Sequence, residues 1–423
     1  MDKFFQIFRI PDLRNKILFV LFILLVFRLM AVIPIPGIDA VRLKGFLESN
    51  QLFGFFNIFS GGALTNLSIM MLGVAPYITA TIIMQLLTMI FPALKQMYYE
   101  EGAVGRAKFN RYSRYLTVPL AALQSYGFLN LLISQGVLGT LTLADTLRNV
   151  VLITAGSMIL VWFGELITEK KIGNGVSLII FAGIVSGLPN VIRTAILSYN
   201  PSALPTYAAF IILSIVVIAG VVFVNQGERK IPISYSRRVR GNKMYGGAAS
   251  YLPLKVNQAG VIPIIFAISI LLFPQFFAQI VSIISPDLSL RLNDLVSKFL
   301  NNQFVYGGIY FALVIVFTYF YTAVTFDPQE ISKNLQRSGG FIPGIRPGEP
   351  SGDFLSKIVK RITLFGAIFL GAIAVLPILT QIFTGIKTLT IGGTALLIVV
   401  SVAIETMKQI DSQMVMREYE GIQ

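Results

Sequence analysis

Long apolar runs alternate with short polar and basic segments along the whole chain. A helix needs about 20 consecutive, mostly apolar residues to cross the hydrocarbon core of a bilayer. Ten runs approach or reach that length, and each of them predicts a membrane-spanning helix. The runs lie at residues 17–35, 69–91, 115–133, 151–167, 176–192, 207–224, 256–277, 304–326, 362–378 and 389–404.

Two segments between these runs show other patterns. Residues 53–66, FGFFNIFSGGALTN, are apolar but too short to cross a bilayer. They predict either an interfacial helix on the outer leaflet or a re-entrant segment, which lipid tolerates only where protein or a water-filled cavity surrounds it. In the polar segment 225–255, the alternating stretch KIPISYSRR predicts a basic β-hairpin.

The basic residues are divided unevenly between the two sides that ten spans create. Cytoplasmic loops of membrane proteins carry an excess of Lys and Arg. If both chain ends are cytoplasmic, most of the 34 basic residues fall on that side, many of them in the loops 225–255 and 327–357. The other side keeps only Arg42, Lys44, Arg148, Arg193, Arg291, Lys298 and Lys387. This asymmetry predicts that both ends are cytoplasmic.

The composition narrows the class of protein. Apolar residues make up 55% of the chain and charged residues 13%, about half the charged fraction of a soluble protein. There is no Cys and no His, so disulfides, imidazole bases and Cys/His metal sites are excluded. No phosphate-binding GxxxxGK[ST] loop is present. We therefore expect an all-α integral membrane protein that is not an enzyme and holds no cofactor. The basic start, without a small-residue cleavage site after it, predicts that no signal peptide is removed.

Few ionisable residues lie inside the predicted spans. Arg28 lies near the outer end of the first span, where its guanidinium is expected to extend to the interface, although an intramembrane charge can also mark a transport pathway. Glu165 lies near the cytoplasmic end of the fourth span, at an expected interfacial position. No carboxylate falls at mid-membrane, and this disfavours an ion-coupled transporter.

Seven stretches carry a resemblance to a known family. They are IPIPGID at 33–39, FNIFSGGALTNLSI at 56–69, PYITATIIMQLLT at 76–88, ITEKKIGNGVSLIIFAGI at 167–184, LPLKVNQAGVIP at 252–263, FIPGIRPGE at 341–349 and GGTALLIVV at 392–400. Through these stretches, in this order, the chain resembles the bacterial SecY family of protein-conducting channel subunits. The resemblance runs almost end to end, except in the outer loops and the C-terminal tail.

The resemblance implies a fold of about ten transmembrane helices in two inverted five-helix halves, residues 1–200 and 201–423, around a central pore. It also implies that the segment 53–66 is a short re-entrant plug helix. The plug residues are Phe56, Asn57, Ile58, Phe59, Ser60, Gly61, Gly62, Ala63 and Leu64.

The family's pore is narrowed by a ring of branched aliphatic side chains. The matching ring residues are Val74, Ile78, Val176, Ile180, Ile265 and Ile398. A hydrophobic constriction closes by dewetting and presents no fixed charge to a passing chain. Taken without the resemblance, each of these residues would be assigned to ordinary core packing or lipid contact.

Uncharged polar residues inside the spans have two interpretations. Their ordinary role is a hydrogen bond between helices, which contributes about 0.6 kcal/mol on average. The resemblance implies a lateral gate instead, where the second and third spans separate from the seventh and eighth to let a signal sequence reach lipid. The gate residues are Thr79, Gln85, Gln124 and Asn257.

The basic loops are expected to bind partners. The resemblance implies the motor ATPase SecA and the translating ribosome, whose RNA phosphates attract clustered Lys and Arg. The expected contact residues are Arg229, Lys230, Arg237, Arg238, Arg240, Lys243, Lys333, Arg337 and Arg346. Positive-inside topology alone would also place these charges there. SecE and SecG are the expected companion subunits, with lipid around them.

The expected function is a passive channel in the bacterial cytoplasmic membrane. It would translocate unfolded secretory preproteins, which carry signal sequences, and release transmembrane segments through the lateral gate. Two alternatives stay open. One is a secondary transporter with broken helices and a substrate site near mid-membrane, and the other is a scaffold or insertase that only holds helices.

Overall fold

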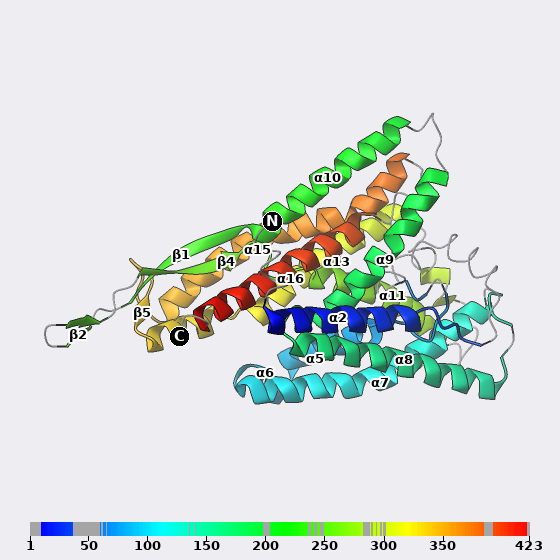
Figure 1. Cartoon of the computed structure of the whole chain (residues 1–423), viewed down its shortest axis with the longest axis horizontal. Coiled ribbons are helices and arrows are strands. Elements are labelled where there is room, and N and C mark those ends of the chain that lie inside the picture. The colour runs from blue at the N-terminus through cyan, green and yellow to red at the C-terminus, as the bar shows by residue number, and fades with distance from the viewer. Residues whose placement is uncertain are drawn as a thin grey trace.

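The computed structural model is a bundle of long helices with a β-hairpin that projects from one end (Figure 1). The structure describes residues 10–36, 60, 62–64, 66–134, 136–139, 141–197, 204–235, 238–240, 243–245, 249–281, 288, 291–292, 294–296, 298, 302–384 and 392–420.

Ten helices in the described part of the chain coincide with the ten predicted spans. They are α2 (Pro11–Met30), α5 (Ala75–Ile90), α7 (Gly102–Ser134), α8 (Leu143–Glu169), α9 (Gly175–Leu197), α10 (Leu204–Gln226), α11 (Ile262–Val281), α13 (Gln303–Thr325), α15 (Glu349–Thr384) and α16 (Gly392–Glu420). Two shorter helices, α6 (Pro92–Tyr99) and α14 (Pro328–Arg337), lie between them.

Five stretches of helix among the described residues are long and apolar enough to cross a membrane. They are Gly102–Ile133, Leu143–Glu169, Ala208–Gln226, Gln303–Arg337 and Glu349–Ile382. Helices α5 and α6 pass the same test only together, and they meet at a bend of 111°. The chain is therefore a multi-pass membrane protein, as predicted, whereas the number of ten crossings stays a prediction.

A proline explains the bend between α5 and α6. The residue before a proline is disfavoured in the helical region of the backbone. Phe91 accordingly has φ −105° and ψ 110°, and it ends α5 where Pro92 begins α6. Proline suits the first position of a helix, because an N–H there would have no partner within the helix.

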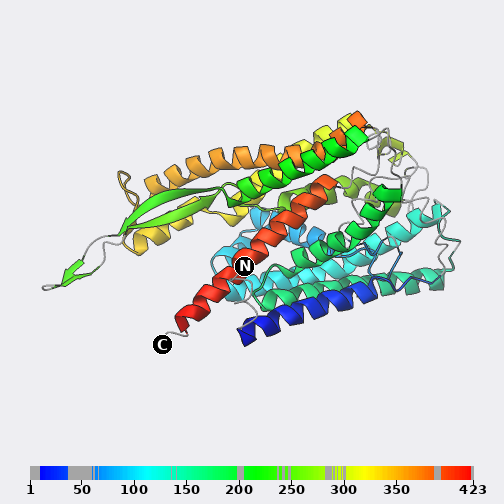
Figure 2. The same cartoon turned by 45° about the horizontal axis from the view of Figure 1, so that its top comes forward.

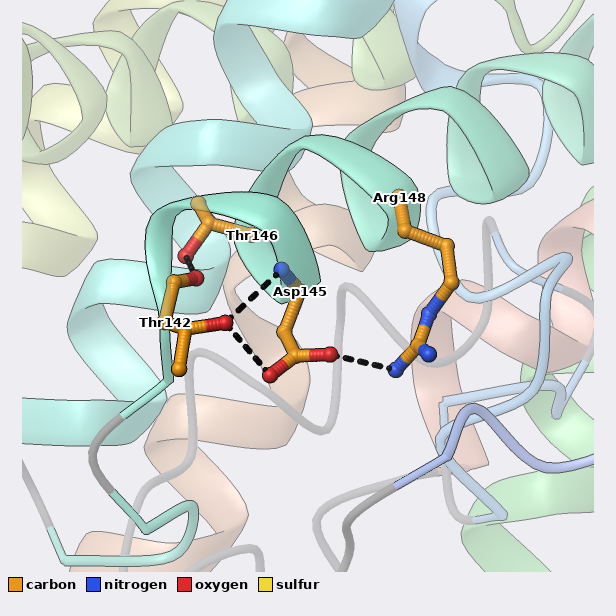
Figure 3. Close-up of polar contacts among 4 residues, drawn as sticks. All are labelled: Thr142, Asp145, Thr146 and Arg148. Carbon is orange, nitrogen blue, oxygen red and sulfur yellow. Dashed lines mark hydrogen bonds and ion pairs between the residues drawn. The ribbon is translucent and has the colours of Figure 1, made fainter.

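Helix α8 begins with a hydrogen-bonded cap (Figure 3). The hydroxyl oxygen of Thr142 accepts from the backbone N–H of Asp145 at 3.2 Å, and the hydroxyl donates to the Asp145 carboxylate at 2.6 Å. The Arg148 guanidinium lies 3.0 Å from the other carboxylate oxygen. The cap satisfies a donor that the helix end leaves unpaired, and the carboxylate lies at the positive end of the helix dipole.

The helices pack as two groups. One group consists of α2, α5, α7, α8 and α9, and the other of α10, α11, α13, α15 and α16. Between the groups, α11 packs against α5 and α7, and α16 packs against α9. We call the contact of α11 and α13 with α5, α6 and α7 the seam. The predicted boundary at residue 200 falls outside the described residues and stays a prediction, as does the inverted relation of the two halves.

The start of α2 and the end of α16 lie together. Leu13 and Met414 are both buried and form one small apolar cluster, against which Ile10, Ile17 and Ile410 pack. The β-hairpin projects from this same end of the molecule (Figures 1 and 2). An even number of crossings would bring both ends of the chain to one side in this way.

The projecting hairpin is made of β1 (Glu228–Tyr235) and β4 (Ala249–Lys255), which pair antiparallel. Its tip carries the short pair β2 (Arg238–Arg240) and β3 (Lys243–Tyr245). The hairpin prediction is therefore confirmed. The other edge of β1 pairs with β5 (Gly340–Phe341), so the two long loops form one three-stranded sheet. A second small core beneath this sheet contains Ile231, Leu254, Ile342, Leu355, Ile358 and Val359.

Candidate functional site

The ring residues come from four helices and one helix cap. Val74 is the N-cap of α5, and Ile78 lies one turn later on the same helix. Val176 and Ile180 lie one turn apart on α9. Ile265 lies on α11 and Ile398 on α16. The six residues therefore come from both groups of helices.

All six residues belong to, or pack against, the main apolar core, to which all ten long helices contribute. Five of them are buried, with exposed fractions from 0% for Val74 to 7% for Ile78. Val176 is partly buried and packs against the same cluster. Burial of this kind fits a closed constriction, and it also fits ordinary core packing, so the ring itself stays a proposal.

The described part of the predicted plug is its end. Ser60, Ala63 and Leu64 are buried, and the last two belong to the cluster that holds the ring residues. The backbone N–H of Leu64 donates to the Ser60 hydroxyl at 3.1 Å, which closes a compact turn. The other plug residues, Phe56, Asn57, Ile58, Phe59 and Gly61, lie outside the described residues. Burial of the end favours a re-entrant segment over an interfacial helix.

The segment between the plug and α5 is buried but not helical. The second span was predicted to begin at Ile69, whereas α5 begins at Ala75. Backbone hydrogen bonds tie the segment to the end of α2: Ile35 donates to Leu67 at 2.9 Å, and Ile69 donates to Ile33 at 3.1 Å. Non-helical backbone at membrane depth is tolerated where protein surrounds and bonds it, so the segment is an internal part of the helix bundle.

Arg28 lies against the end of the plug. Its Nη1 atom is 3.5 Å from the position that a Cβ would take at Gly62, whose φ is +80°. Arg28 is half-buried in the last turn of α2. The guanidinium, which was expected to extend to the interface, thus also contacts the plug segment.

The predicted gate residues do not form one hydrogen-bonded network among the described residues. The Thr79 hydroxyl donates to Ala75 in its own helix at 3.0 Å. The side-chain oxygens of Gln85 and Gln124 are buried without a hydrogen-bond partner in the described structure. All three side chains belong to α5 and α7, which pack against α11. Their role in a gate stays a proposal.

The fourth predicted gate residue, Asn257, forms hydrogen bonds within the other group of helices. Its amide donates to the Asn225 side-chain oxygen at 2.9 Å and to the Gly260 carbonyl at 3.1 Å. Asn225 in turn donates to the Ser401 hydroxyl at 2.7 Å. The network joins α10, the segment before α11 and α16, so it stabilises one group of helices from within. The sequence showed Asn225 only as a polar residue at the end of an apolar run.

The predicted docking residues lie on the strands of the hairpin, on α14 and on the turn before α15. Arg229, Lys230, Lys333, Arg337 and Arg346 are all exposed. The Gly348 carbonyl accepts from the Ser332 hydroxyl at 2.5 Å, and the Arg346 carbonyl accepts from the Ser351 hydroxyl at 2.8 Å. Arg346 is therefore presented on a fixed turn. Arg237 and the side chains of Arg238, Arg240 and Lys243 lie outside the described part.

One ion pair was not predicted. Arg114 on α7 lies 2.9 Å from the carboxylate of Glu165 on α8. The sequence marked Glu165 as an expected interfacial charge but gave no sign of its partner, which is 51 residues away. Among the residues that the structure describes, no group of three or more His, Cys, Asp or Glu side chains is placed to hold a metal ion.

Solved structures share this fold at low sequence identity. One, described as a protein-conducting channel, is 20% identical with a TM-score of 0.65, covering 94% of this chain and 91% of that one. Canine Sec61 in a ribosome–channel complex from the endoplasmic reticulum is 20% identical with a TM-score of 0.63 over the same shares. A third structure concerns the SecY plug domain, which stabilises the closed state of that channel; it has 20% identity and a TM-score of 0.61, covering 93% of this chain and 91% of that one.

Sequence relatives match the whole chain. The protein translocase subunit SecY of Mycobacterium tuberculosis is 43% identical over 441 residues, covering 100% of this chain and 99% of the relative. The same subunit of Thermus thermophilus is 44% identical over 435 residues, covering 100% and 97%. The SecY family model matches residues 68–407. With a match that spans both groups of helices and the sheet, this chain belongs to the SecY family.

Proposed function

We propose that this chain is the channel-forming subunit of a protein translocase in the bacterial cytoplasmic membrane. It moves unfolded secretory proteins through its centre and releases transmembrane segments sideways into lipid. The observation that carries the proposal is that all six ring residues, from both groups of helices, lie in or pack against the main apolar core of the bundle. Membership of the SecY family supports it.

The ring would act as a seal without chemistry of its own. Branched side chains fill a constriction, and a dewetted constriction blocks ions while it is closed. A passing chain contacts only apolar groups, so the ring need not discriminate between charged and neutral segments. The protein performs no covalent reaction in this scheme, and the energy for movement comes from a partner.

The plug would support the seal from one side. The burial of Ala63 and Leu64 in the same apolar core as the ring residues supports this role, because a segment packed there would have to move before a chain could pass. The Arg28 guanidinium lies beside Gly62, so the end of α2 is next to the end of the plug. Opening then requires the plug segment to move away from the ring.

The seam between the two groups would be the lateral gate. The predicted gate residues Thr79, Gln85 and Gln124 belong to α5 and α7, two of the helices that form one side of the seam. The unpartnered amide oxygens of the two glutamines can meet water when the helices part, which lowers the cost of opening. Asn257 contributes indirectly, since it is bonded within the other group.

The exposed basic residues of the sheet and of α14 would bind the partners. We infer that SecA and the ribosome dock here, on the side that contains both chain ends, and that this side is cytoplasmic. The likeness to Sec61 in a ribosome–channel complex supports the ribosome as a partner. SecE and SecG are the proposed companion subunits.

The test uses the whole complex in sealed vesicles. The chain, reconstituted with SecE and SecG and supplied with SecA and ATP, should protect a secretory preprotein from added protease. Failure to move a fully secreted protein would favour a scaffold or insertase. Uptake of a small solute without SecA would favour a transporter.

The ring has its own matched test on α9. Ile179 and Ile180 are adjacent and equally buried, each 1% exposed, but only Ile180 is a ring residue. Ile180→Ser should raise the resting ion conductance in planar bilayers, because a hydroxyl hydrates the constriction. Ile179→Ser should lower stability without a leak. Equal conductance in both variants would reject the ring assignment.

A further inference from the structure

A tyrosine joins the two groups of helices at the hairpin end of the seam. The hydroxyl of Tyr99, the last residue of α6, donates to the backbone carbonyl of Val324 at 2.8 Å. Val324 lies in the last turn of α13, where a helix leaves carbonyl groups without partners. A side chain from one group thus satisfies a buried backbone acceptor in the other.

Tyr99 moves with the first group, because α6 is fixed to α7. The Tyr98 ring packs edge-on against Tyr99 and against Phe109 of α7, with centroids 5.0 and 4.8 Å apart. Gly105 of α7 lies so close to α6 that a Cβ there would be 2.0 Å from the Met97 carbonyl oxygen. The two helices therefore cannot slide past each other without unpacking.

Val324 moves with the second group. The Phe266 ring of α11 packs edge-on against Phe317 and Tyr321 of α13, with centroids 5.9 and 6.1 Å apart. The N–H of Phe326 donates to the Thr322 carbonyl at 2.9 Å, which closes the last turn of α13. The acceptor is therefore held on a rigid element.

The surroundings keep the Tyr99 hydroxyl protonated. Burial, with smaller contributions from Tyr98, Asp327 and Glu330, raises the pKa of Tyr99 to about 12. Asp327 is the N-cap of α14 and accepts from the N–H groups of Gln329 and Glu330. The hydroxyl thus remains a hydrogen-bond donor throughout the physiological range.

We propose that the Tyr99–Val324 hydrogen bond is a latch that must break before the seam opens, so that Tyr99 sets how strong a signal sequence must be. The inference rests on the proposed function of a channel with a lateral gate. A signal sequence opens the seam by the gain of moving its apolar core into lipid. If the latch is absent, a shorter core is sufficient. One neutral hydrogen bond corresponds to a change of about two- to tenfold in the ratio of open to closed seam.

The test compares two variants that differ only in which hydroxyl is removed. Tyr99→Phe keeps the ring and removes the latch donor. Tyr98→Phe removes a neighbouring hydroxyl that makes no hydrogen bond in the described part of the structure, and it serves as the matched control. Each variant is reconstituted as the complex with its companion subunits and motor. Two preproteins are supplied, identical except for a shortened apolar core in one signal sequence.

Tyr99→Phe should raise translocation of the weakened preprotein about two- to tenfold and leave that of the intact one within about twofold. Tyr98→Phe should leave both at the wild-type level. The latch proposal is wrong if Tyr99→Phe translocates the weakened preprotein only as well as wild type does. It is also wrong if the variant lowers translocation of both preproteins alike. If wild type fails on the intact preprotein, the proposed function fails instead, and the two failures are thus distinguishable.

A second measurement needs no transport. The chain has no native Cys, so Lys95→Cys on α6 and Lys333→Cys on α14, both exposed positions, accept spin labels at those two sites alone. In the reconstituted complex without substrate, Tyr99→Phe should shift part of the label-to-label distance distribution to longer values, and Tyr98→Phe should not. An unchanged distribution in Tyr99→Phe would overturn the latch.

Discussion

The hydrogen atom that serves as the side chain of Gly156 lets α8 approach the segment before α5. A Cβ at this position would lie 2.1 Å from the Ile69 carbonyl oxygen, a backbone atom that has no room to move aside. Gly156 is buried, and the segment that it faces is tied to α2 on its other side. The close approach thus helps to hold the non-helical segment in place.

Gly156→Ala should therefore destabilise the protein. Overpacking of a buried site costs about 1–3 kcal/mol, and the extra methyl has to push α8 away from the Ile69 carbonyl. Thermal unfolding in detergent is the measurement. Gly308→Ala on α13 is the control, since nothing lies within 4 Å of a Cβ there and alanine is the better helix former. A Gly156→Ala protein as stable as that control would contradict the packing argument.

Arg346 carries a prediction about partner choice. Its turn is held by the hydroxyls of Ser332 and Ser351, so the substitution Arg346→Glu changes charge without releasing the turn. The resemblance matches Arg346, within GIRPG, to a position that the family uses for SecA-driven transport. We therefore expect SecA-driven translocation to fall more than co-translational insertion, measured side by side in vesicles. Lys357→Glu, an equal charge change on exposed α15, is the control. Equal loss in both assays would contradict a specific role in SecA docking.

At this scale, residue type was predictable and residue partners were not. The sequence marked Asn257 as polar in an apolar setting, and the resemblance placed it in the gate. Its hydrogen bonds run to Asn225 and onward to Ser401, residues that come close only through the packing of α10 and α16. Local sequence does not contain that information, because the contacts depend on helices far apart in the chain.

At the scale of elements, the cap of α8 is a self-contained unit. Thr142→Ala should remove the acceptor for the Asp145 N–H and cost about 1 kcal/mol of stability. The first turn should then exchange its amide hydrogens faster, as hydrogen–deuterium exchange would show. Thr146→Val is the control, because the Thr146 hydroxyl only donates to the Thr142 carbonyl one turn back. Unchanged exchange at the start of α8 would show that the cap contributes nothing.

The plug makes a prediction at the same scale. Deleting residues 56–64 removes Ala63 and Leu64 from the cluster of ring residues, and the resting ion conductance in planar bilayers should rise. Closed channels that are as tight as wild type after the deletion would show that this segment does not seal the pore.

Helices were predictable from hydropathy, and irregular segments were not. The run that begins at Ile69 is as apolar as a span, so hydropathy counted it as helix. The backbone instead adopts positive φ at Leu67, just before this run, and at Gly73 within it, and α5 starts only at Ala75. Strand β5 was missed for a similar reason: two residues, Gly340 and Phe341, pair with β1 only because the two loops meet in space.

On the scale of the whole molecule, polar contacts bind each group of helices internally. Arg114 and Glu165 join α7 to α8, and Asn225 and Ser401 join α10 to α16. Between the groups, on the side away from the seam, the Gln413 amide donates to the carbonyls that precede α9, at Lys170 and Lys171. The internal contacts hold each group together as a unit. Such an arrangement suits a channel that opens when one group moves against the other.

Charge predicts that both chain ends are cytoplasmic. The two described ends do lie together, at Leu13 and Met414, and the side of the membrane that they face stays a prediction. The charge asymmetry can be counted from the sequence, because it depends on which loops hold the basic residues and not on which residues meet in space. The mutual arrangement of the two groups is set by buried surfaces between α11 and α7 or between α16 and α9. No pattern within a single helix specifies which other helix it will meet.

Because of the bend at Pro92, α6 projects sideways from the end of α5, so a rotation about the α5 axis displaces α6. Helix α6 has 8 residues and is therefore about 12 Å long, and it leaves the axis of α5 at 111°. Because α6 is packed on α7, the two move together. If they turn with α5 about its axis by about 10°, the far end of α6 moves sideways by roughly 2 Å, whereas the end of a straight helix would only turn in place. A small twist deep in the bundle is thereby converted into a sweep across the membrane surface, large enough to break a single hydrogen bond.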